Sequence, residues 1–175
     1  MRFGRRVKRT LGGALVLVFV VGLFFPESHL IPVQGATSAD WNAHSFWYSP
    51  WGKSGVHKGI DIFARKGTPV LASSTGLTVY SGNFGIGGRV VVVLSAKWRL
   101  HYYAHLKDAD TKSLRWVHAG QKIGSVGNSG DAQGKPSHLH YAILSLIPRP
   151  WRIQSGAQGW KRMFYLDPGN WLISR

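Results

Sequence analysis

Cysteine is absent from the sequence, and acidic residues are few. Without cysteine the chain forms no disulfide and offers no thiolate to a metal, so any metal site must consist of imidazole and carboxylate groups. Seven Asp and Glu residues stand against 22 Lys and Arg, which gives a formal net charge of +15. Such a basic chain is expected to bind anionic partners.

Segments with the apolar spacing of an amphipathic helix are also few, whereas glycine accounts for 22 of the 175 residues. This length suits one hydrophobic core rather than two. Short apolar segments alternate with turns rich in glycine and polar residues, which is typical of antiparallel strands. We therefore predict a mainly β, sandwich-like single domain with an antiparallel sheet. Its expected strands are residues 68–73, 77–82, 89–95, 100–106 and 138–147.

The N-terminus has a different composition. Five basic side chains within residues 2–9 precede an uncharged apolar run from Leu11 to Phe25. This order is typical of an export signal or a membrane anchor, although the run is shorter than the roughly 20 residues of a full span. We predict that residues 1–26 form an apolar signal or anchor helix, with a retained anchor favoured. Cleavage stays open, since VQG before Ala36 is a distant candidate site.

Export would change which anionic partners we expect. Everything after Pro26 would lie outside the cytoplasm, where a basic domain meets cell-wall polymers and anionic lipid headgroups rather than nucleic acid. A basic surface that serves only solubility is the alternative. Residues 27–46 lack periodicity and are predicted to form a linker between the N-terminal helix and the domain.

Polar residues at even spacing recur in the expected strands. His57 and Asp61 stand in HKGID, and His138 and His140 stand in SHLHYAI. Side chains two or four positions apart on a strand share a face, so each pair is expected to point in one direction, with a bend at Gly59 as the alternative for the first pair. A zinc site with three protein ligands and an open position for water needs this inventory of side chains.

A third segment, HYYAHL, places His101 and His105 four residues apart. The same spacing predicts a shared face, so His101 either lines the site or supports it from nearby. The other histidines lie in segments without such a pattern, and we expect them at the surface or in the linker. They are His29, His44 and His118.

The order of these motifs resembles that of one known family. HKGIDIFARKGTPVLASSTGLTVYSGNFGIGGRVVVV is followed by YYAHL and then by GQKIGSVGNSGDAQGKPSHLHYAI. This arrangement, over about residues 50–145, is similar to the LytM/lysostaphin-type zinc metallopeptidases, which are murein and glycyl-glycine endopeptidases. YLDPGNWL, within residues 165–173, resembles the closing segment of that family. The resemblance implies a duplicated-hybrid-motif-like β domain over residues 47–175.

The resemblance also implies a role for each matching polar residue. His57, Asp61 and His140 take the positions of the three protein ligands of one Zn²⁺ per chain. When bound, that zinc would polarise the scissile carbonyl and make its water ligand more acidic. His105 and His138 match the two catalytic histidines that do not bind the metal. His138 is expected to act as general base and His105 to stabilise the oxyanion, with the division between the two left open.

Two features depart from the family pattern. Lys53 stands where related sequences often carry arginine, which changes the expected contacts with a substrate. Residues 148–164 form an insertion that is rich in tryptophan and basic side chains. This composition suits a lipid interface or a sugar polymer; alternatively, the insertion is a surface flap that covers the sheet.

Together these observations predict an exported zinc metalloendopeptidase of the cell envelope that hydrolyses peptide bonds in peptidoglycan stem peptides or cross-links. One alternative is a catalytically silent LytM-like domain that binds and regulates another cell-wall hydrolase. All five expected site positions are filled, which favours the enzyme. Another alternative is a basic membrane-surface protein whose histidines are structural. The sequence identifies neither the bond that is cleaved nor the oligomeric state.

Overall fold

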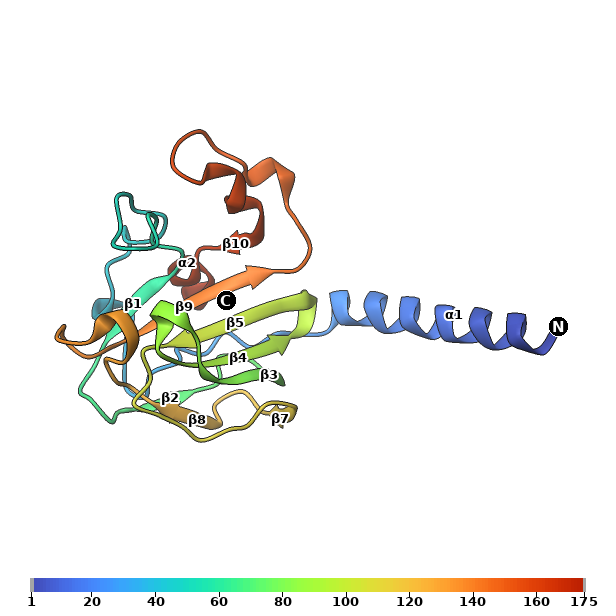
Figure 1. The fold of residues 1–175 in the computed structure, drawn as a ribbon, viewed down its shortest axis with the longest axis horizontal. Coiled ribbons are helices and arrows are strands. Elements are labelled where there is room, and N and C mark those ends of the chain that lie inside the picture. The colour runs from blue at the N-terminus through green and yellow to red at the C-terminus, as the bar shows by residue number, and fades with distance from the viewer. Residues whose placement is uncertain (1, 175) are drawn as a thin grey trace.

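Two antiparallel sheets make up most of the fold (Figure 1). The structure is a computed structural model that describes the backbone of residues 2–174 and the side chains of residues 12–174. Among the described residues the larger sheet has seven strands, in the order β1-β9-β5-β4-β3-β7 with β10 also paired to β9. The smaller sheet has three described strands, in the order β2-β8-β6. The predicted mainly β, antiparallel fold is confirmed.

The strand boundaries follow the apolar segments of the sequence closely. The strands are β1 (Ile60–Phe63), β2 (Pro69–Leu71), β3 (Gly76–Asn83), β4 (Arg89–Ser95), β5 (Arg99–Ala104), β6 (Asp108–Ala109), β7 (Arg115–Val117), β8 (Lys122–Ser125), β9 (His138–Ser145) and β10 (Tyr165–Leu166). The α-helices within the described residues are α1 (Arg2–Phe24) and α2 (Pro168–Ile173).

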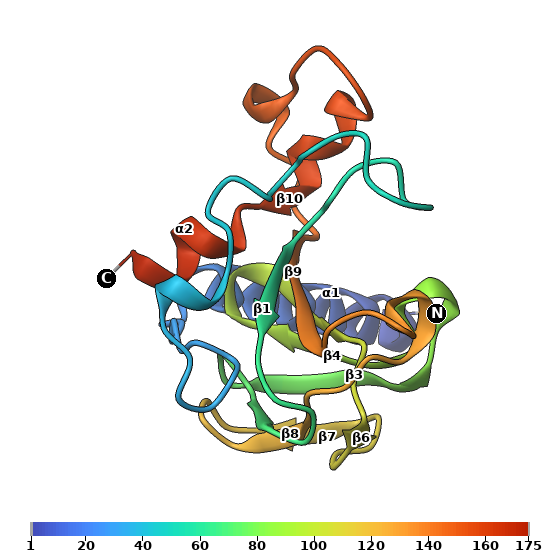
Figure 2. The ribbon, with the colours of Figure 1, turned by 90° about the vertical axis from the view of Figure 1, so that its left-hand side faces the viewer.

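The hydrophobic core lies between the two sheets, and Figure 2 shows the smaller sheet below the larger one. Val91 and Val93 of β4 and Tyr103 of β5 are fully buried and pack in one cluster with Val70 and Ile123 of the smaller sheet. Because side chains alternate along a strand, the residues between them point to the opposite face of the larger sheet. That outer face is available for a site.

Residues 27–46, for which we predict a linker, pack against the domain. Val33 and Trp41 belong to the hydrophobic core. Val33 also forms an antiparallel β-bridge with Val70, and the N–H of Leu71 donates to the carbonyl oxygen of Pro32 at 2.9 Å. The segment therefore adds a short pairing to the edge of β2 instead of spanning open space.

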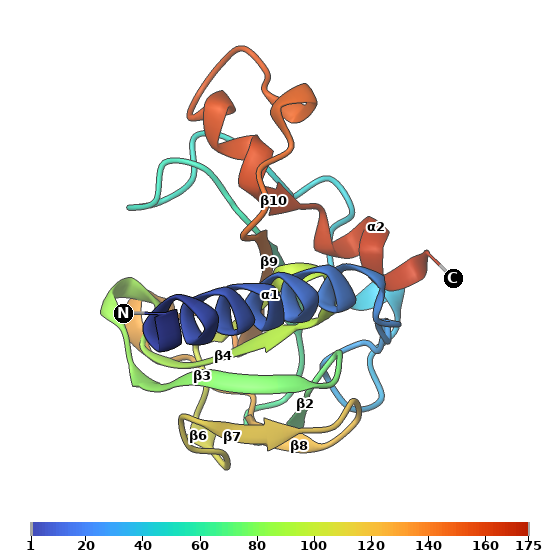
Figure 3. The same cartoon turned by 90° about the vertical axis from the view of Figure 1, so that its right-hand side faces the viewer.

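Helix α1 covers the basic and apolar N-terminal residues and extends away from the sheets (Figure 1). Figure 3 shows it from the side of the N-terminus, in front of β3 and β4. The ring of Phe19 stacks on Trp98 in the β4–β5 turn at a centroid distance of 5.5 Å. Among the described residues, no helix combines the length and the apolar character that a membrane crossing requires. The signal or anchor stays a prediction.

The C-terminal segment returns to the larger sheet. β10 pairs with β9, and α2 begins at Pro168, whose fixed φ suits the first helical position. The carboxylate of Asp167 caps this helix by accepting hydrogen bonds from the N–H groups of Gly169 at 3.0 Å and Asn170 at 3.3 Å. Trp171 of α2 lies in the core, so the helix closes one end of it.

Residues 148–164, the predicted insertion, form a flap at the end of the fold opposite the smaller sheet (Figure 2). The flap contains two 3₁₀-helices, η5 (Pro150–Arg152) and η6 (Gly159–Phe164). The guanidinium of Arg162 lies 5.5 Å from the ring centroid of Phe46 and 5.2 Å from that of Trp47. Since these rings belong to the segment that leads into β1, the flap borders the start of that strand.

Candidate metal centre

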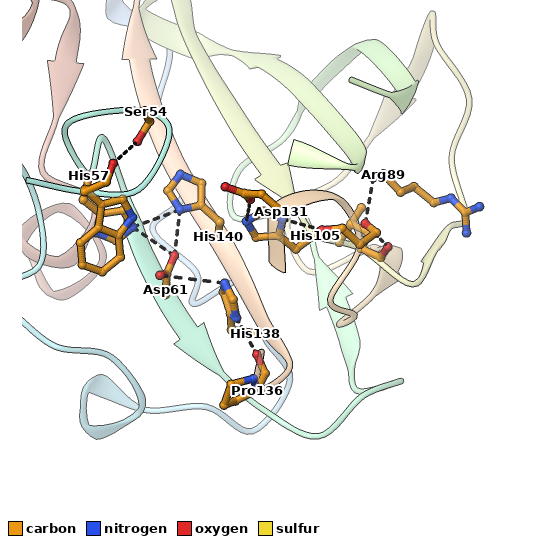
Figure 4. Close-up of polar contacts among 12 residues, drawn as sticks. Ser54, His57, Asp61, Arg89, His105, Asp131, Pro136, His138 and His140 are labelled. Carbon is orange, nitrogen blue, oxygen red and sulfur yellow. Dashed lines mark hydrogen bonds and ion pairs between the residues drawn. The ribbon is translucent and has the colours of Figure 1, made fainter. Parts of the chain in front are cut away.

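Three polar side chains meet where β1 runs beside β9 (Figure 4). His57 precedes β1, Asp61 lies on β1, and His140 lies on β9 in register with Asp61. The residues on either side of Asp61 and His140 point into the core, so these two side chains take the outer face of the sheet. The even spacing of His138 and His140 places both on this face.

The ligand atoms of the three side chains form a small triangle. His57 Nε2 lies 3.1 Å from Asp61 Oδ1 and 3.2 Å from His140 Nδ1. His140 Nδ1 lies 2.8 Å from the same Asp61 oxygen. A tetrahedral zinc with bonds of about 2.0–2.1 Å keeps its ligand atoms about 3.3–3.4 Å apart. The triangle is therefore close to one face of a zinc tetrahedron, and the residues fit this metal.

A hydrogen bond orients the ring of His57 toward the centre of the triangle. Its Nδ1 lies 3.0 Å from the carbonyl oxygen of Ser45. A carbonyl only accepts, so Nδ1 carries the proton and Nε2 keeps its lone pair toward the centre. The ring of Trp51 stacks on the imidazole at a centroid distance of 4.1 Å, and His57 is buried. Its orientation is thus fixed from two sides.

Asp61 is ionised at neutral pH. Burial acts to raise the pKa of its carboxyl, but the adjoining imidazoles of His140 and His57 outweigh burial. They hold the pKa of Asp61 well below its usual range. An anionic carboxylate beside two imidazoles is the donor set that a divalent cation requires in a chain without cysteine.

Two further histidines flank the triangle with their Nε2 atoms free of carbonyl partners. His138 Nδ1 donates to the carbonyl oxygen of Pro136 at 2.8 Å, and His105 Nδ1 donates to that of Ser129 at 2.9 Å. Each neutral ring therefore presents the lone pair of Nε2. His138 Nε2 lies 3.9 Å from Asp61 Oδ2. These nitrogens can accept a proton from a group bound in the centre.

His105 reaches this face in a way that its spacing does not predict. It follows the end of β5 and has a φ of +62°, which reverses the alternation of the strand. His101 lies within the regular part of β5 and shares the core face with Tyr103, where its ring is fully buried. The predicted shared face of His101 and His105 is wrong, and His101 does not line the site.

The environment of His105 favours its neutral form. Burial lowers the pKa of its imidazole to about 4, and the neighbouring imidazoles of His140 and His138 act in the same direction. The hydrogen bond to Ser129 and the carboxylate of Asp131, 3.7 Å from Nε2, oppose this shift without reversing it. At neutral pH His105 is uncharged.

The three side chains of the triangle and the two flanking histidines line one groove of about 1,040 Å³. Tyr102 and Ala104 of β5 contribute to its floor, and the aromatic rings of Trp51, Tyr80 and Phe84 stand along its sides. A ligand site of this size, largely apolar with a few convergent polar groups, can hold an extended peptide. The arrangement combines a cation site, two proton acceptors and room for a chain.

The remaining histidines are outside the groove. His44 and His118 are exposed, and the ring of His29 packs at a tilt against Trp171 with a centroid distance of 4.1 Å. Several residues that support the site escape sequence reasoning, because they act through backbone carbonyls that every residue type carries. They are Ser45, Ser129 and Pro136. Trp51 supports the site through its side chain and is visible in the sequence as a tryptophan six residues before His57. Its position in a glycine-rich turn does not indicate that it stacks on the imidazole.

Comparison with known sequences agrees with this geometry. Residues 55–148 match the sequence model of peptidase family M23. L-Ala–D-Glu endopeptidase of Bacillus subtilis (strain 168) is 36% identical over 124 residues, which are 66% of this chain and 37% of that protein. The murein hydrolase activator NlpD of Escherichia coli (strain K12) is 34% identical over 90 residues, 51% of this chain and 23% of that protein. The chain spans well under half the length of these curated relatives.

Comparison with solved structures gives the same result. The catalytic domain of lysostaphin from Staphylococcus simulans, described as an antimicrobial peptidase, is 30% identical and superimposes with a TM-score of 0.57. The alignment covers 74% of this chain and 90% of that domain. Most of the lysostaphin domain therefore has a counterpart here.

Proposed function

Because the chain belongs to peptidase family M23, we propose that it is an exported zinc metalloendopeptidase that hydrolyses peptide bonds in the stem peptides or cross-links of peptidoglycan. The observation that carries this proposal is the meeting of three ligand atoms within 4.8 Å of one another. They lie beside His138 and His105, whose Nδ1 atoms are bonded to carbonyl oxygens and whose rings line the same groove. This combination suits hydrolysis of a bound peptide.

A zinc ion held by His57, Asp61 and His140 would supply Lewis acidity toward the scissile carbonyl and toward water. Histidine side chains of the protein transfer the protons of the reaction. Nε2 of His138 accepts a proton from the attacking water, while its Nδ1 stays bonded to Pro136. The protonated ring, next to the carboxylate of Asp61, then delivers that proton to the leaving amine.

The pKa of His105, about 4, makes it a weaker proton acceptor at neutral pH and supports His138 as the general base. We assign His105 to the oxyanion. Negative charge that develops beside its Nε2 would raise the pKa of the ring, so that Nε2 takes up a proton from solvent water in the groove and donates a hydrogen bond to the oxyanion. The backbone contact with Ser129 keeps His105 in position during this change.

A second candidate function is regulation of another cell-wall hydrolase without catalysis. The similarity to NlpD, named as a murein hydrolase activator, favours it. The filled ligand positions and the two oriented histidines favour the enzyme, because a domain that only binds a partner has no need of them. The L-Ala–D-Glu bond that the Bacillus relative is named for is one candidate for the bond cleaved.

We further propose that residues 1–26 direct export, either as a signal or as a retained membrane anchor, so that the domain acts in the cell envelope. The supporting observation is the basic and apolar order of these residues. The excess of basic side chains would then meet anionic wall polymers or lipid headgroups.

Incubation of the zinc-loaded full chain with purified sacculi, followed by mass spectrometry of the released fragments, tests the function and identifies the bond. His57→Ala should lose the metal, whereas His105→Ala should keep about one zinc per chain and lose at least about 100-fold in cleavage rate. His118→Ala, at an exposed histidine outside the groove, should change neither. Zinc retention by His57→Ala would disprove the ligand set. Zinc binding without any cleavage by the unaltered chain would favour the regulator.

A further inference from the structure

Two lysines lie near one another where residues 51–58 meet the flap, and one of them, Lys58, lines the groove. Lys58 Nζ donates to the carbonyl oxygen of Ser54 at 3.2 Å. Gln158 Nε2 donates to the same oxygen at 2.9 Å, and Lys161 Nζ donates to Gln158 Oε1 at 3.1 Å. A continuous chain of hydrogen bonds thus holds both ammonium groups at one junction. We call Lys58 and Lys161 the lysine pair.

No carboxylate neutralises the lysine pair among the residues that the structure describes. The sequence has only seven acidic residues, and each is engaged elsewhere. Glu27 contacts Arg99 and His101, Asp40 contacts Thr37, Asp61 contacts His57 and His140, Asp108 contacts Arg89 and Lys107, Asp110 contacts Lys122, Asp131 contacts His105, and Asp167 caps α2. Two like charges therefore share one junction without an internal counter-ion.

The ammonium groups keep unused donors. Each lysine carries three N–H groups. Lys58 directs two of them to the carbonyl oxygens of Ser54 and Val56, and Lys161 directs one to Gln158. Lys58 lines the groove and directly follows His57. An anion bound here would lie near the candidate metal centre.

The lysine pair depends on the insertion. Gln158 and Lys161 belong to the flap and lie beyond residues 55–148, the part of the chain that matches family M23. Lys53 and Lys135 also line the groove, whereas its only lining carboxylates, Asp61 and Asp131, face histidines. The electrostatic potential of the groove is therefore expected to favour anions.

We propose that the lysine pair binds a free carboxylate of the substrate peptide, so that the groove prefers acidic peptides to uncharged ones such as glycine bridges or amidated stems. This inference rests on the proposed peptidase function and names the substrate class for it. Charge-assisted hydrogen bonds from two ammonium groups to one carboxylate are strong and directional. They would also relieve the repulsion between the two lysines.

The test uses two synthetic cross-linked stem peptides that are identical except that the carboxylates of one are converted to amides. The zinc-loaded full chain should cleave the acidic peptide with a kcat/KM about tenfold higher, the effect of one charge-assisted hydrogen bond. Lys161→Gln should bring this ratio close to one, mainly through a higher KM for the acidic peptide. Lys58→Gln should do the same with its zinc content unchanged.

Lys112→Gln is the matched control. It removes one positive charge from an exposed side chain outside the groove, so the ratio should stay as in the unaltered chain. Raising the salt concentration from about 0.05 to 0.5 M should reduce the ratio in the unaltered chain, because salt screens the ion pair.

Equal cleavage of the two peptides by the unaltered chain would overturn the inference and leave the peptidase function intact. If Lys161→Gln cleaves the acidic and the amidated peptide more slowly by the same factor, the inference is also overturned. The lysine would then only hold the flap against residues 51–58. If the zinc-loaded chain cleaves neither peptide nor sacculi, the proposed function fails and the inference fails with it.

Discussion

Gly59 stands between His57 and Asp61, just before β1, where the backbone passes close to Tyr141 and His140 of β9. A Cβ atom at this position would lie 2.4 Å from the carbonyl oxygen of Tyr141 and 3.0 Å from His140 Nε2. The first of these neighbours is backbone and cannot move aside without separating the strands. The absence of a side chain at one residue thus allows two ligands from different strands to meet.

Gly59→Ala is therefore expected to weaken metal binding without removing a ligand. The added methyl group pushes β1 away from β9 and lengthens the distance between Asp61 and His140, so zinc affinity should fall by about tenfold or more. Competition with a chromophoric chelator measures this affinity. Gly13→Ala in α1, where the added Cβ meets nothing within 4 Å, is the control. Unchanged affinity in Gly59→Ala would show that the strands tolerate the methyl group.

At this scale the sequence predicts the polar residues of the site better than their orientation. His138 and His140 share a face because β9 is regular, as the spacing indicates. The position of His105 depends on its positive φ and on hydrogen bonds of its backbone N–H to Gly87 and of its ring to Ser129. Both partners are distant in sequence, and no local pattern reveals them.

One buried carboxylate, that of Glu27, holds the segment after α1 against the larger sheet. Glu27 has a fully buried side chain that forms an ion pair with Arg99 of β5. Its Oε1 accepts a hydrogen bond from Ser95 Oγ at 2.9 Å and lies 3.3 Å from His101 Nε2. His101 Nδ1 in turn accepts from the hydroxyl of Tyr141 at 2.7 Å. Glu27 thus fastens residues 27–34 to the core side of the larger sheet.

Glu27→Gln should destabilise the protein by about 3 kcal/mol, because it leaves the charge of Arg99 largely buried without a counter-ion. Urea unfolding followed by tryptophan fluorescence measures the loss. Asp110→Asn is the matched control, since its partner Lys122 lies at 2.9 Å on the surface, with the two side chains 38% and 53% exposed. An exposed pair contributes less than about 1 kcal/mol. Equal losses in the two variants would show that burial of Glu27 adds nothing.

The same cluster predicts that acid destabilises the fold. Burial lowers the pKa of His101, against the opposing effect of Glu27. Burial alone would raise the pKa of Glu27, but His101 and Arg99 outweigh it and lower that pKa. Both groups have lower pKa values when folded, so the unfolded chain binds more protons as the pH falls.

The stabilisation from this cluster should accordingly be complete above about pH 6.5, the ordinary pKa of histidine, and decline below it. Each proton taken up on unfolding makes the slope steeper by about 1.4 kcal/mol per pH unit. Urea unfolding between pH 7.5 and about 4.5 measures the slope. His101→Gln should make the free energy of unfolding less dependent on pH at about pH 6.5. If the variant loses stability with falling pH as steeply as the unaltered chain, His101 is not a cause of the loss.

Strands and the N-terminal segment differ in how far the sequence predicts them. Continuous apolar runs indicate β4 and β9, and each of these strands buries one whole face. Residues 27–46 have no such face. They are held by isolated contacts such as the ion pair of Glu27 with a residue 72 positions away, and only the folded sheet brings those partners together.

For the molecule as a whole, these contacts determine where the peptidase domain begins. Val33 is part of the core and pairs with Val70, and Glu27 closes the buried ion pair. The candidate cleavage site before Ala36 would remove both. A chain released at that point would lose core contacts, whereas cleavage near Pro26, or no cleavage, would preserve them. The structure therefore favours a mature protein that keeps Glu27.

A chain that starts at Ala36 should accordingly unfold at a temperature at least about 10 °C lower than a chain that starts at Pro26. Loss of the Glu27 ion pair and of a buried valine costs roughly 5 kcal/mol, and each kcal/mol corresponds to about 2–4 °C for a chain of this size. Differential scanning calorimetry of the two zinc-free chains makes the comparison without any contribution from the metal. Equal midpoints would mean that residues 27–35 only lie on the domain, and cleavage before Ala36 would then be compatible with a stable enzyme.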